Sequence, residues 1–583
     1  MRPAALALFF FVPALAACQS AGALQVKVRY KPELASRPLD GRLLLVVATD
    51  DKREPREQVT DGDDTAQVYG MDVDGWTGGQ SVALGGDVAG YPQAAITHLP
   101  PGEYWVQAVL HRYETFHRSD GHVVKLPPDR GEGQNWAKAP GNLVSTPRHV
   151  RIDAAGGSIS VELDQALPEI RMPPDTRYLR HVQMKSELLS RFWGRDMFVK
   201  ALVLLPEGWD SHPDAHYPVI IYHSHFGAEL EGYGDQPPDE KLPPYSIDGL
   251  RRECPNGHTS GCAKNGYARY QAEAEYRFHQ LWTGKGFPRV ILVQIQHANP
   301  YYDDSYAVNS ENLGPYGDAI TRELVPYLEK TFRGLGPWAR GMYGGSTGGW
   351  EAIAAQMFYP DEYNGAIANC PDPIDFRAYV TVNIYDDDNA YVTGGAFRGT
   401  PRASSREDDG ALRSTMAQDN QMELALGTRS RSGQQYDIWE AVYSPVGADG
   451  YPRRIWDKRT GVIDKSVAAS WRERYDLGHI LTRDWATLGP KLAGKLRINV
   501  GNMDTYYLDR AVRLFQERLG ALANPTPDVV VDYGARDGHC WSGDHDHKNV
   551  ESRLTYHERF IPLLVDRFLR TAPAGADTSS WRY

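Results

Sequence analysis

The fold of this chain is decided by residues 340–358, which read RGMYGGSTGGWEAIAAQMF. Residues 340–343 are typical of a short buried strand and residues 350–355 of a helix. Between them lies the pattern Gly-x-Ser-x-Gly, in which glycines leave room for a sharp strand-to-helix turn that exposes a serine. A phosphate-binding turn is the alternative reading, but no lysine follows the glycines. The segment therefore predicts Ser346 as a nucleophile.

Outward from this turn, residues 175–572 alternate between apolar strand-like runs and helical segments. Strands are expected at 199–205, 219–222, 290–295, 341–343, 366–368, 498–500 and 529–531, and helices at 267–282, 317–331, 349–358, 508–519 and 553–569. Such alternation predicts a mostly parallel sheet covered by helices on both faces. The active sites of these sheets lie in loops at the carboxyl ends of the strands.

Two insertions interrupt the alternation, at residues 229–265 and 371–490. The first is rich in proline and glycine, and the second is far longer than an ordinary connection. A long segment between strands is expected to cover the site as a lid. The aromatic residues of the second insertion either stack on sugars or aromatic acids or pack the core of the lid itself. They include Tyr385, Tyr391, Trp439 and Tyr443.

Residues 23–170 follow a different pattern. Residues 24–28 and 159–163 alternate with period two, and glycine, aspartate and proline punctuate the apolar runs between them. The pattern predicts an N-terminal all-β sandwich, which either orients the catalytic domain or binds substrate. A linker is expected near residues 167–174, and residues 573–583 form a C-terminal tail.

The first 18 residues have the layout of a secretory signal, with one arginine, an apolar run at residues 4–15 and then small residues. The run is too short to span a membrane. Leu15-Ala16-Ala17-Cys18 resembles a bacterial lipoprotein box, which predicts lipidation of Cys18 as the membrane attachment. The alternative is ordinary cleavage at the neighbouring alanines. Either way we expect an exported protein, which is periplasmic, anchored in the outer membrane or secreted.

Net charge and cysteine content limit which binding partners, disulfides and metals are expected. The formal net charge of −12 argues against nucleic acid as a partner. Besides Cys18 the chain has Cys254, Cys262, Cys370 and Cys540, an even number that permits three disulfide pairings in an oxidising compartment. Cys254 and Cys262 could close a short loop, which would leave Cys370 and Cys540 as a long-range pair. The absence of a Cys-x-x-Cys pair disfavours zinc, and we expect no metal and no cofactor.

The partners of Ser346 are expected further along the chain, first an acid and then a histidine. Asp504 follows the strand that ends at residue 500, with Asp509 as the second choice and helix capping as the alternative role. His539 follows the strand at residues 529–531 on a glycine-containing loop and is the expected general base. The later run Asp544-His545-Asp546-His547 is expected to be a solvated loop rather than a metal site.

A tetrahedral intermediate also needs backbone donors. One is the N–H of Thr347, the residue after the nucleophile. The second is expected from the loop 223–227, which reads HSHFG, at the amide of His225 or Phe226. Histidines at positions 223 and 225 could instead share a metal ion, but a histidine near the oxyanion loop is the favoured reading.

These residues resemble the putative-esterase family of α/β-hydrolases, which includes enterochelin esterases, esterase D-like enzymes, and acetylxylan and feruloyl esterases. The resemblance covers about residues 177–570 and rests on the segments GGSTGG at 344–349 and GPYGD at 314–318, on Asp504 and on Gly538-His539. It implies an α/β-hydrolase fold and a carboxylic ester hydrolase that works through an acyl-enzyme. Acyl transfer is an alternative, because the family includes mycolyltransferases. A non-catalytic surface binding protein is another, against which the intact Ser, Asp and His argue.

Two features depart from the family pattern. The insertion at residues 371–490 is much longer than the usual connection, so the family's substrate pocket cannot be carried over. Cys540 directly after His539 is similar to tannase-like esterases, in which cysteines beside the serine and the histidine are bridged. Here Gly345 precedes the serine, so the resemblance implies a bridge only through Cys370.

Overall fold

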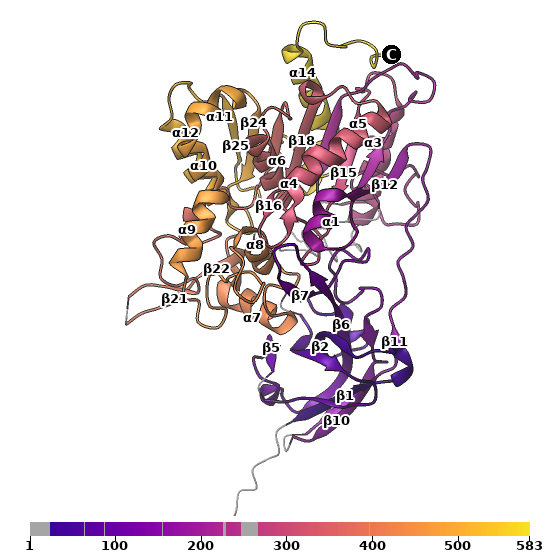
Figure 1. The fold of residues 1–583 in the computed structure, drawn as a ribbon, viewed down its shortest axis with the longest axis vertical. Helices are drawn as coiled ribbons and strands as arrows, with labels where there is room; N and C mark the ends of the chain where they lie inside the picture. The colour runs from indigo at the N-terminus through magenta and orange to yellow at the C-terminus, as the bar shows by residue number, and fades with distance from the viewer. Residues whose placement is uncertain are drawn as a thin grey trace, which may run out of the picture.

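The computed structural model describes residues 24–62, 64–86, 88–153, 156–224, 229–246, 266–395, 397–407 and 409–583. An N-terminal β domain lies beside an α/β domain, and the long insertion of the α/β domain lies next to both (Figure 1). No helix in these described ranges is long and apolar enough to cross a membrane. Five residues singled out above lie outside the described residues: Cys18, His225, Phe226, Cys254 and Cys262.

The N-terminal domain is built from two sheets that share one apolar core. The smaller sheet has the order β10-β1-β4 and the larger sheet β11-β8-β6-β2-β3-β5, with β7 and β9 pairing to β6. In β1, residues 26, 28 and 30 are buried and those between them are exposed, as period-two alternation predicts. The strands are β1 (Gln25–Tyr30), β2 (Leu39–Ala48), β3 (Gln67–Trp76), β4 (Val82–Leu84), β5 (Ala89–Tyr91), β6 (Gly102–His117), β7 (Val123–Leu126), β8 (Leu143–Val144), β9 (Arg148–Ile152), β10 (Ser158–Leu163) and β11 (Gln165–Ala166).

The α/β domain is centred on a sheet with the order β12-β13-β15-β14-β18-β19-β24-β25. Every pairing from β15 to β25 is parallel, whereas β12 and β13 run antiparallel to their neighbours. All seven expected strands are present, and the edge strand β12 was not predicted. The strands are β12 (Leu179–Ser186), β13 (Met197–Leu204), β14 (Val219–His223), β15 (Ile291–Gln296), β18 (Arg340–Gly345), β19 (Ala366–Asn369), β24 (Leu496–Gly501) and β25 (Val529–Gly534).

Helices cover both faces of this sheet. A Cβ atom added to Gly341 of β18 would meet Phe568, whereas one added to Gly344 would meet Gly348. Gly341 and Gly344 are three positions apart, so their Cβ positions point to opposite faces of the sheet. Phe568 belongs to α14 and Gly348 to α6, and these two helices therefore lie on opposite sides of the sheet. The helices of the domain are α1 (Glu187–Trp193), α3 (Tyr267–Thr283), α4 (Tyr316–Asp318), η5 (Ala319–Leu324), α5 (Val325–Phe332), α6 (Thr347–Phe358), α12 (Leu508–Gly520), α13 (Asn549–Ser552) and α14 (Tyr556–Thr571).

The long insertion is mostly helical and has its own aromatic core. The ring centre of Tyr379 lies within 6 Å of the ring centres of Trp439, Trp456 and Trp471. Tyr391, Trp439 and Tyr443 are buried, so packing of the insertion accounts for most of its aromatic residues. The elements are β20 (Val392–Thr393), β21 (Thr400–Pro401), β22 (Ala403–Arg406), β23 (Leu412–Thr415), α7 (Met416–Leu426), α8 (Gln435–Tyr443), α9 (Lys465–Arg474), α10 (Leu477–Arg483) and α11 (Trp485–Leu492).

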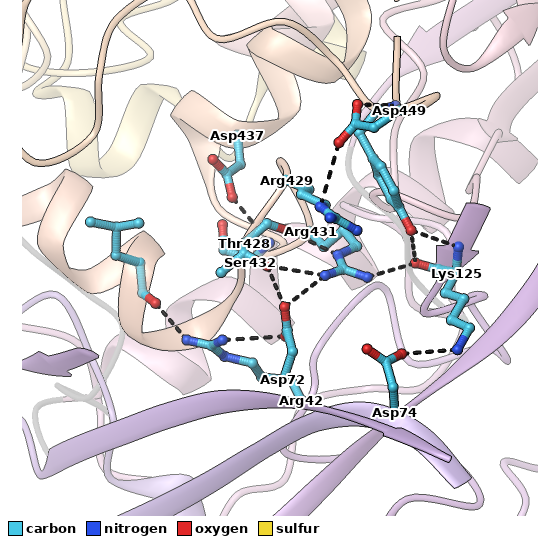
Figure 2. A network of polar contacts seen from close by, with 12 residues as sticks. Arg42, Asp72, Asp74, Lys125, Thr428, Arg429, Arg431, Ser432, Asp437 and Asp449 are labelled. Carbon is cyan, nitrogen blue, oxygen red and sulfur yellow. Dashed lines mark hydrogen bonds and ion pairs between the residues drawn. The ribbon is translucent and has the colours of Figure 1, made fainter. Parts of the chain in front are cut away.

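The insertion is attached to the N-terminal domain by a buried polar network (Figure 2). Helix α7 packs against β2, β3 and β5. Arg42 of β2 donates hydrogen bonds to the backbone oxygens of Leu424 and Ala425, at 2.6 and 3.2 Å. Asp72 of β3 accepts from Arg42 at 3.2 Å and from Arg431 at 2.8 Å. The N-terminal domain therefore holds the insertion in place, which favours an orienting role for the sandwich.

Removing the carboxylate of this network should destabilise the protein. In Asp72→Ala, the guanidinium groups of Arg42 and Arg431, whose side chains are 3% and 5% exposed, would lose their shared anion. We expect a loss of about 3 kcal/mol in the free energy of unfolding, measured by urea denaturation. Asp74→Ala is the matched control, because Asp74 pairs with Lys125 but is 73% exposed. Equal stability of the two variants would contradict the expectation.

Candidate active site

Ser346 lies at the turn between β18 and α6 in a strained backbone conformation, with φ 56° and ψ −121°. A positive φ at a residue other than glycine costs about 1–3 kcal/mol and is common at catalytic positions. The turn is tight because α6 approaches β14 closely: a Cβ atom at Gly348 would lie 2.1 Å from the backbone oxygen of His223. Only glycine fits there, which is the physical reason for the Gly-x-Ser-x-Gly pattern.

Asp504 and His539 lie together at the carboxyl ends of β24 and β25. His539 donates from Nδ1 to Asp504 Oδ2 at 2.8 Å, and Asp504 is fully buried. The other oxygen of Asp504 accepts the N–H groups of Tyr506 and Leu508, at 2.9 and 3.3 Å. These bonds fix the carboxylate so that it orients the imidazole. Asp509, the second choice for the acid, pairs instead with Arg406 and Arg513.

Ser346 and His539 line the same cavity, which has a volume of about 1010 Å³. The Ser346 hydroxyl donates to Asp372 Oδ1 at 3.3 Å. Within the described residues, no hydrogen bond joins Ser346 to His539. Catalytic hydrogen bonds are often long without substrate and tighten when it binds.

Asp372 is a site residue that the sequence reasoning missed. Its Oδ2 accepts hydrogen bonds from Tyr306 at 2.7 Å and from the hydroxyl of Thr347 at 3.2 Å. Gln435 of α8 donates to the Tyr306 hydroxyl at 2.5 Å, so a chain of hydrogen bonds runs from the insertion to the nucleophile. One signal was available: Asp372 follows β19 at the sheet edge that carries Ser346 and Asp504.

Three parts of the chain besides the α/β core contribute to the cavity wall. Asp61 belongs to the N-terminal domain, Glu229 and Tyr233 belong to the first insertion, and Tyr436 and Trp439 belong to α8 of the second. The sandwich thus contributes directly to the cavity, as well as holding the insertion in place. The expected oxyanion donor Thr347 is the first residue of α6, so its N–H has no partner within the helix. The second donors, His225 and Phe226, lie outside the described residues.

A buried group of His223, His297 and Glu351 lies behind the nucleophile turn. Glu351 of α6 is 3.2 Å from Nδ1 of His223 and 3.4 Å from Nε2 of His297. The N–H of Ser305 donates to Nδ1 of His297 at 3.1 Å, so the network assigns the ring proton to Nε2. The three side chains form a buried polar cluster behind the turn.

The two cysteines expected as a long-range pair lie beside His539. Cys370 directly follows β19, and Cys540 directly follows His539. Their Sγ atoms are 2.9 Å apart and both side chains are free thiols, so the expected disulfide is not formed.

The contribution of Glu351 to stability should fall between about pH 4.3 and pH 8. Burial raises the pKa of Glu351 to about 8, and burial lowers the pKa of the facing His223 to about 4. The folded state keeps a proton on Glu351 that the unfolded chain releases above about pH 4.3, so the contribution of Glu351 to stability decreases as pH rises from there to about 8. The contribution of His223 changes in the opposite direction, between about pH 4 and pH 6.5, and is shared by wild type and a Glu351 variant. As pH rises from 5 to 8, the free energy of unfolding of Glu351→Gln should fall by about 3 kcal/mol less than that of wild type, as measured by urea denaturation. The control variant Glu33→Gln, at an exposed position, should behave as wild type, and an unchanged pH dependence in Glu351→Gln would refute the assignment.

Comparisons with known proteins gave one family-model match and likenesses to solved structures. A search of the curated proteins found no significant match. Among solved structures, a ferulic acid esterase is 15% identical, with 67% of this chain and 98% of that chain covered and a TM-score of 0.31. An S-formylglutathione hydrolase from Agrobacterium tumefaciens is 13% identical, with 68% and 98% covered and a TM-score of 0.30. The family model described as Putative esterase matches residues 193–423, a region that includes the segments GPYGD and GGSTGG on which the resemblance to that family rests.

Proposed function

We propose that this protein is an exported serine esterase that cleaves a carboxylic ester through an acyl-enzyme. The observation that carries the proposal is the 2.8 Å bond between His539 and Asp504 at the cavity that Ser346 also lines. Export is proposed from the leader in residues 1–18, with Cys18 as the lipidated residue.

The three side chains divide the chemistry as follows. His539 takes the proton of the Ser346 hydroxyl as its oxygen attacks the ester carbonyl, since a neutral hydroxyl is a poor nucleophile. Asp504 holds the imidazole in the tautomer with Nδ1–H and stabilises the imidazolium. The N–H of Thr347 and an amide of His225 or Phe226 stabilise the oxyanion. His539 then protonates the leaving alcohol, and water releases the acid by the same steps in reverse order.

The substrate is proposed to be an ester of a carbohydrate or of an aromatic acid. The cavity of about 1010 Å³ has room for a group of that size. Its wall includes the rings of Tyr436 and Trp439, which offer apolar faces, and the carboxylates of Asp61 and Asp372, which accept hydrogen bonds from hydroxyl groups.

A fluorophosphonate probe tests the reaction class, and an ester panel tests the substrate. Wild-type protein should be labelled covalently at Ser346, and labelling should compete with the best substrate. Acetyl, feruloyl and short-chain nitrophenyl esters should be compared, with an added alcohol to detect acyl transfer. Absence of labelling together with absence of hydrolysis across the panel would reject the esterase and leave a binding protein.

A further inference from the structure

One end of the cavity at Ser346 lies on the face of the sheet that α14 covers. Tyr222 of β14 and Tyr343 of β18 are paired in register, so their side chains point to the same face. The Tyr222 hydroxyl is 2.5 Å from that of Tyr556, and the Tyr343 hydroxyl is 2.5 Å from Nδ1 of His557. Both partners belong to α14, and all three tyrosines line the cavity. This part of the cavity is called the α14 end.

The other end lies on the α6 face and is walled by the second insertion. The ring centre of Tyr443 in α8 is 5.3 Å from that of Trp350 in α6, so the two helices lie side by side. Tyr436 and Trp439 of α8 line the cavity, and this part is called the insertion end. Ser346 follows β18 at the sheet edge between the two faces. An ester whose carbonyl carbon meets the serine hydroxyl must therefore extend its acid part toward one end and its alcohol part toward the other.

The charged groups at the two ends differ. Arg553, three residues before α14, is the one lysine or arginine among the described residues that line the cavity. At the insertion end, the lining carboxyl groups are those of Asp61, Asp419 and Glu423. Glu423 is ion-paired with Lys458, whose side chain is buried. A ligand at the insertion end therefore meets carboxyl groups, whereas one at the α14 end meets a guanidinium group.

Asp419 is the carboxyl group that the wall leaves for a ligand. Asp61 is paired with Arg413 of β23 at 2.9 Å. The partner of Asp419 is neutral, because its Oδ2 accepts the hydroxyl of Ser414 at 3.2 Å. A negative charge on the substrate would face this carboxyl group, and repulsion between like charges disfavours binding. The insertion end is thus suited to an uncharged group.

Other polar groups of the insertion end are neutral. The hydroxyls of Ser404 and Tyr436 share a hydrogen bond of 2.6 Å, and Gln434 adds an amide to the wall. Trp439 is 3% exposed, and its indole N–H has no hydrogen-bond partner among the described residues. A buried donor without a partner is costly, so an oxygen atom of a ligand at this position would be favourable. Hydroxyl groups both donate and accept, and they therefore match this mixture of groups.

The insertion end also lies on the side of the site that holds the imidazole. Tyr506 lines the cavity and contacts His539 edge-on, with 4.9 Å between the ring centres. Arg406 of β22 donates to the backbone oxygen of Asp504 at 2.9 Å, and the same strand carries Ser404 of the cavity wall. The wall is thus attached to the segment that orients the histidine. Because the histidine protonates the leaving alcohol, the alcohol part of the ester lies on this side.

We propose that the insertion end is the alcohol subsite of the enzyme and that it binds an uncharged alcohol rich in hydroxyl groups, such as a neutral sugar. Asp419 accepts hydrogen bonds from the hydroxyls of this group, and the indole N–H of Trp439 donates to one of its oxygens. The acid part of the ester then occupies the α14 end. The proposal rests on the proposed function, since an alcohol subsite requires an ester as substrate.

Three esters of the same acid test the charge of the alcohol. The acyl group that wild type cleaves best is carried on methanol, on a ring hydroxyl of a neutral hexose, and on the same hydroxyl of the corresponding hexuronate. At pH 7 we expect kcat/KM to be about tenfold higher for the hexose ester than for the methyl ester, and no higher for the hexuronate ester than for the methyl ester. A hexuronate ester cleaved as fast as the hexose ester would overturn the proposal, and so would a hexose ester cleaved no faster than the methyl ester.

Two variants of the insertion end test where the alcohol binds. Asp419→Asn replaces the carboxylate, and Trp439→Phe removes the indole N–H but keeps an aromatic ring. Each should raise KM about fivefold more for the hexose ester than for the methyl ester. Asp419→Asn carries the test alone if Trp439→Phe does not fold. Tyr556→Phe at the α14 end is the control and should leave the ratio of the two KM values as in wild type.

The outcomes separate the subsite from the reaction class. An equal rise in KM for both esters in Asp419→Asn would place the acid part at the insertion end and overturn the assignment. A ratio of KM values that stays as in wild type would remove Asp419 from the subsite and overturn it as well. A failure of the proposed function would look different, because wild type would then show neither fluorophosphonate labelling of Ser346 nor hydrolysis of any of the three esters.

Discussion

Replacement of Ser346 with alanine is expected to lower kcat by about 10⁶-fold toward any ester that the wild-type enzyme cleaves. The expectation follows from the geometry of the turn between β18 and α6. Ser346 has the exposed position of a nucleophile elbow, at φ 56°, and its hydroxyl lies in the cavity that His539 also lines. Without this oxygen no acyl-enzyme forms, and only substrate binding and the oxyanion donors remain. Steady-state hydrolysis of the best panel ester provides the measurement.

A second serine of the same cavity provides the matched control. Ser405 also lines the cavity, and its hydroxyl bonds to Ser414 at 2.6 Å rather than to any residue of the triad. Ser405→Ala should change kcat by less than about tenfold, since it alters packing but removes no reacting group. If Ser346→Ala retained the turnover of this control, a different nucleophile would have to be sought.

The strands of the sheet, and the positions of Ser346, Asp504 and His539 after them, were predictable because their sequence signals are local. Each of the seven expected strands is a short apolar run between turn residues, and such a run is the usual sequence pattern of a strand that is buried on both faces. That Asp504 and His539 lie close together could be predicted because the carboxyl ends of parallel strands meet at one edge of the sheet. Their 2.8 Å contact follows from that topology. The alternating pattern of β1 likewise indicated the N-terminal β domain.

Other features depend on how distant segments pack and have no local signature. The edge strand β12 has a mostly half-exposed surface, so it lacks the apolar run of a central strand. The helices of the long insertion bury polar and charged residues such as Asn420, Glu423 and Glu440, which hides an amphipathic period. Asp61 lines the cavity only because the sandwich packs against the insertion. Hydrogen bonds of Arg42 and Asp72 hold these two parts together.

Replacement of Asp504 with asparagine is expected to lower kcat by about 10⁴-fold at neutral pH. An amide in this position can donate to Nδ1 of His539 and so favour the wrong tautomer, in which Nε2 carries the proton and cannot accept one from Ser346. The same variant loses the negative charge that stabilises the imidazolium. Hydrolysis measured from pH 6 to pH 10 should show only partial recovery at high pH.

Two other carboxylates serve as controls that separate the specific effect of Asp504→Asn from the loss of a negative charge near the site. Asp509 is buried nearby but pairs with Arg406 and Arg513, so Asp509→Asn should retain most of the activity. Asp372 accepts the Ser346 hydroxyl at 3.3 Å, whereas Nδ1 of His539 donates to Asp504 at 2.8 Å. Asp372→Asn should therefore affect kcat far less than Asp504→Asn and leave the tautomer of His539 unchanged. If the loss were larger in Asp372→Asn than in Asp504→Asn, the acid that serves the histidine would be the one after β19, and the bond seen at 2.8 Å would belong to a resting arrangement.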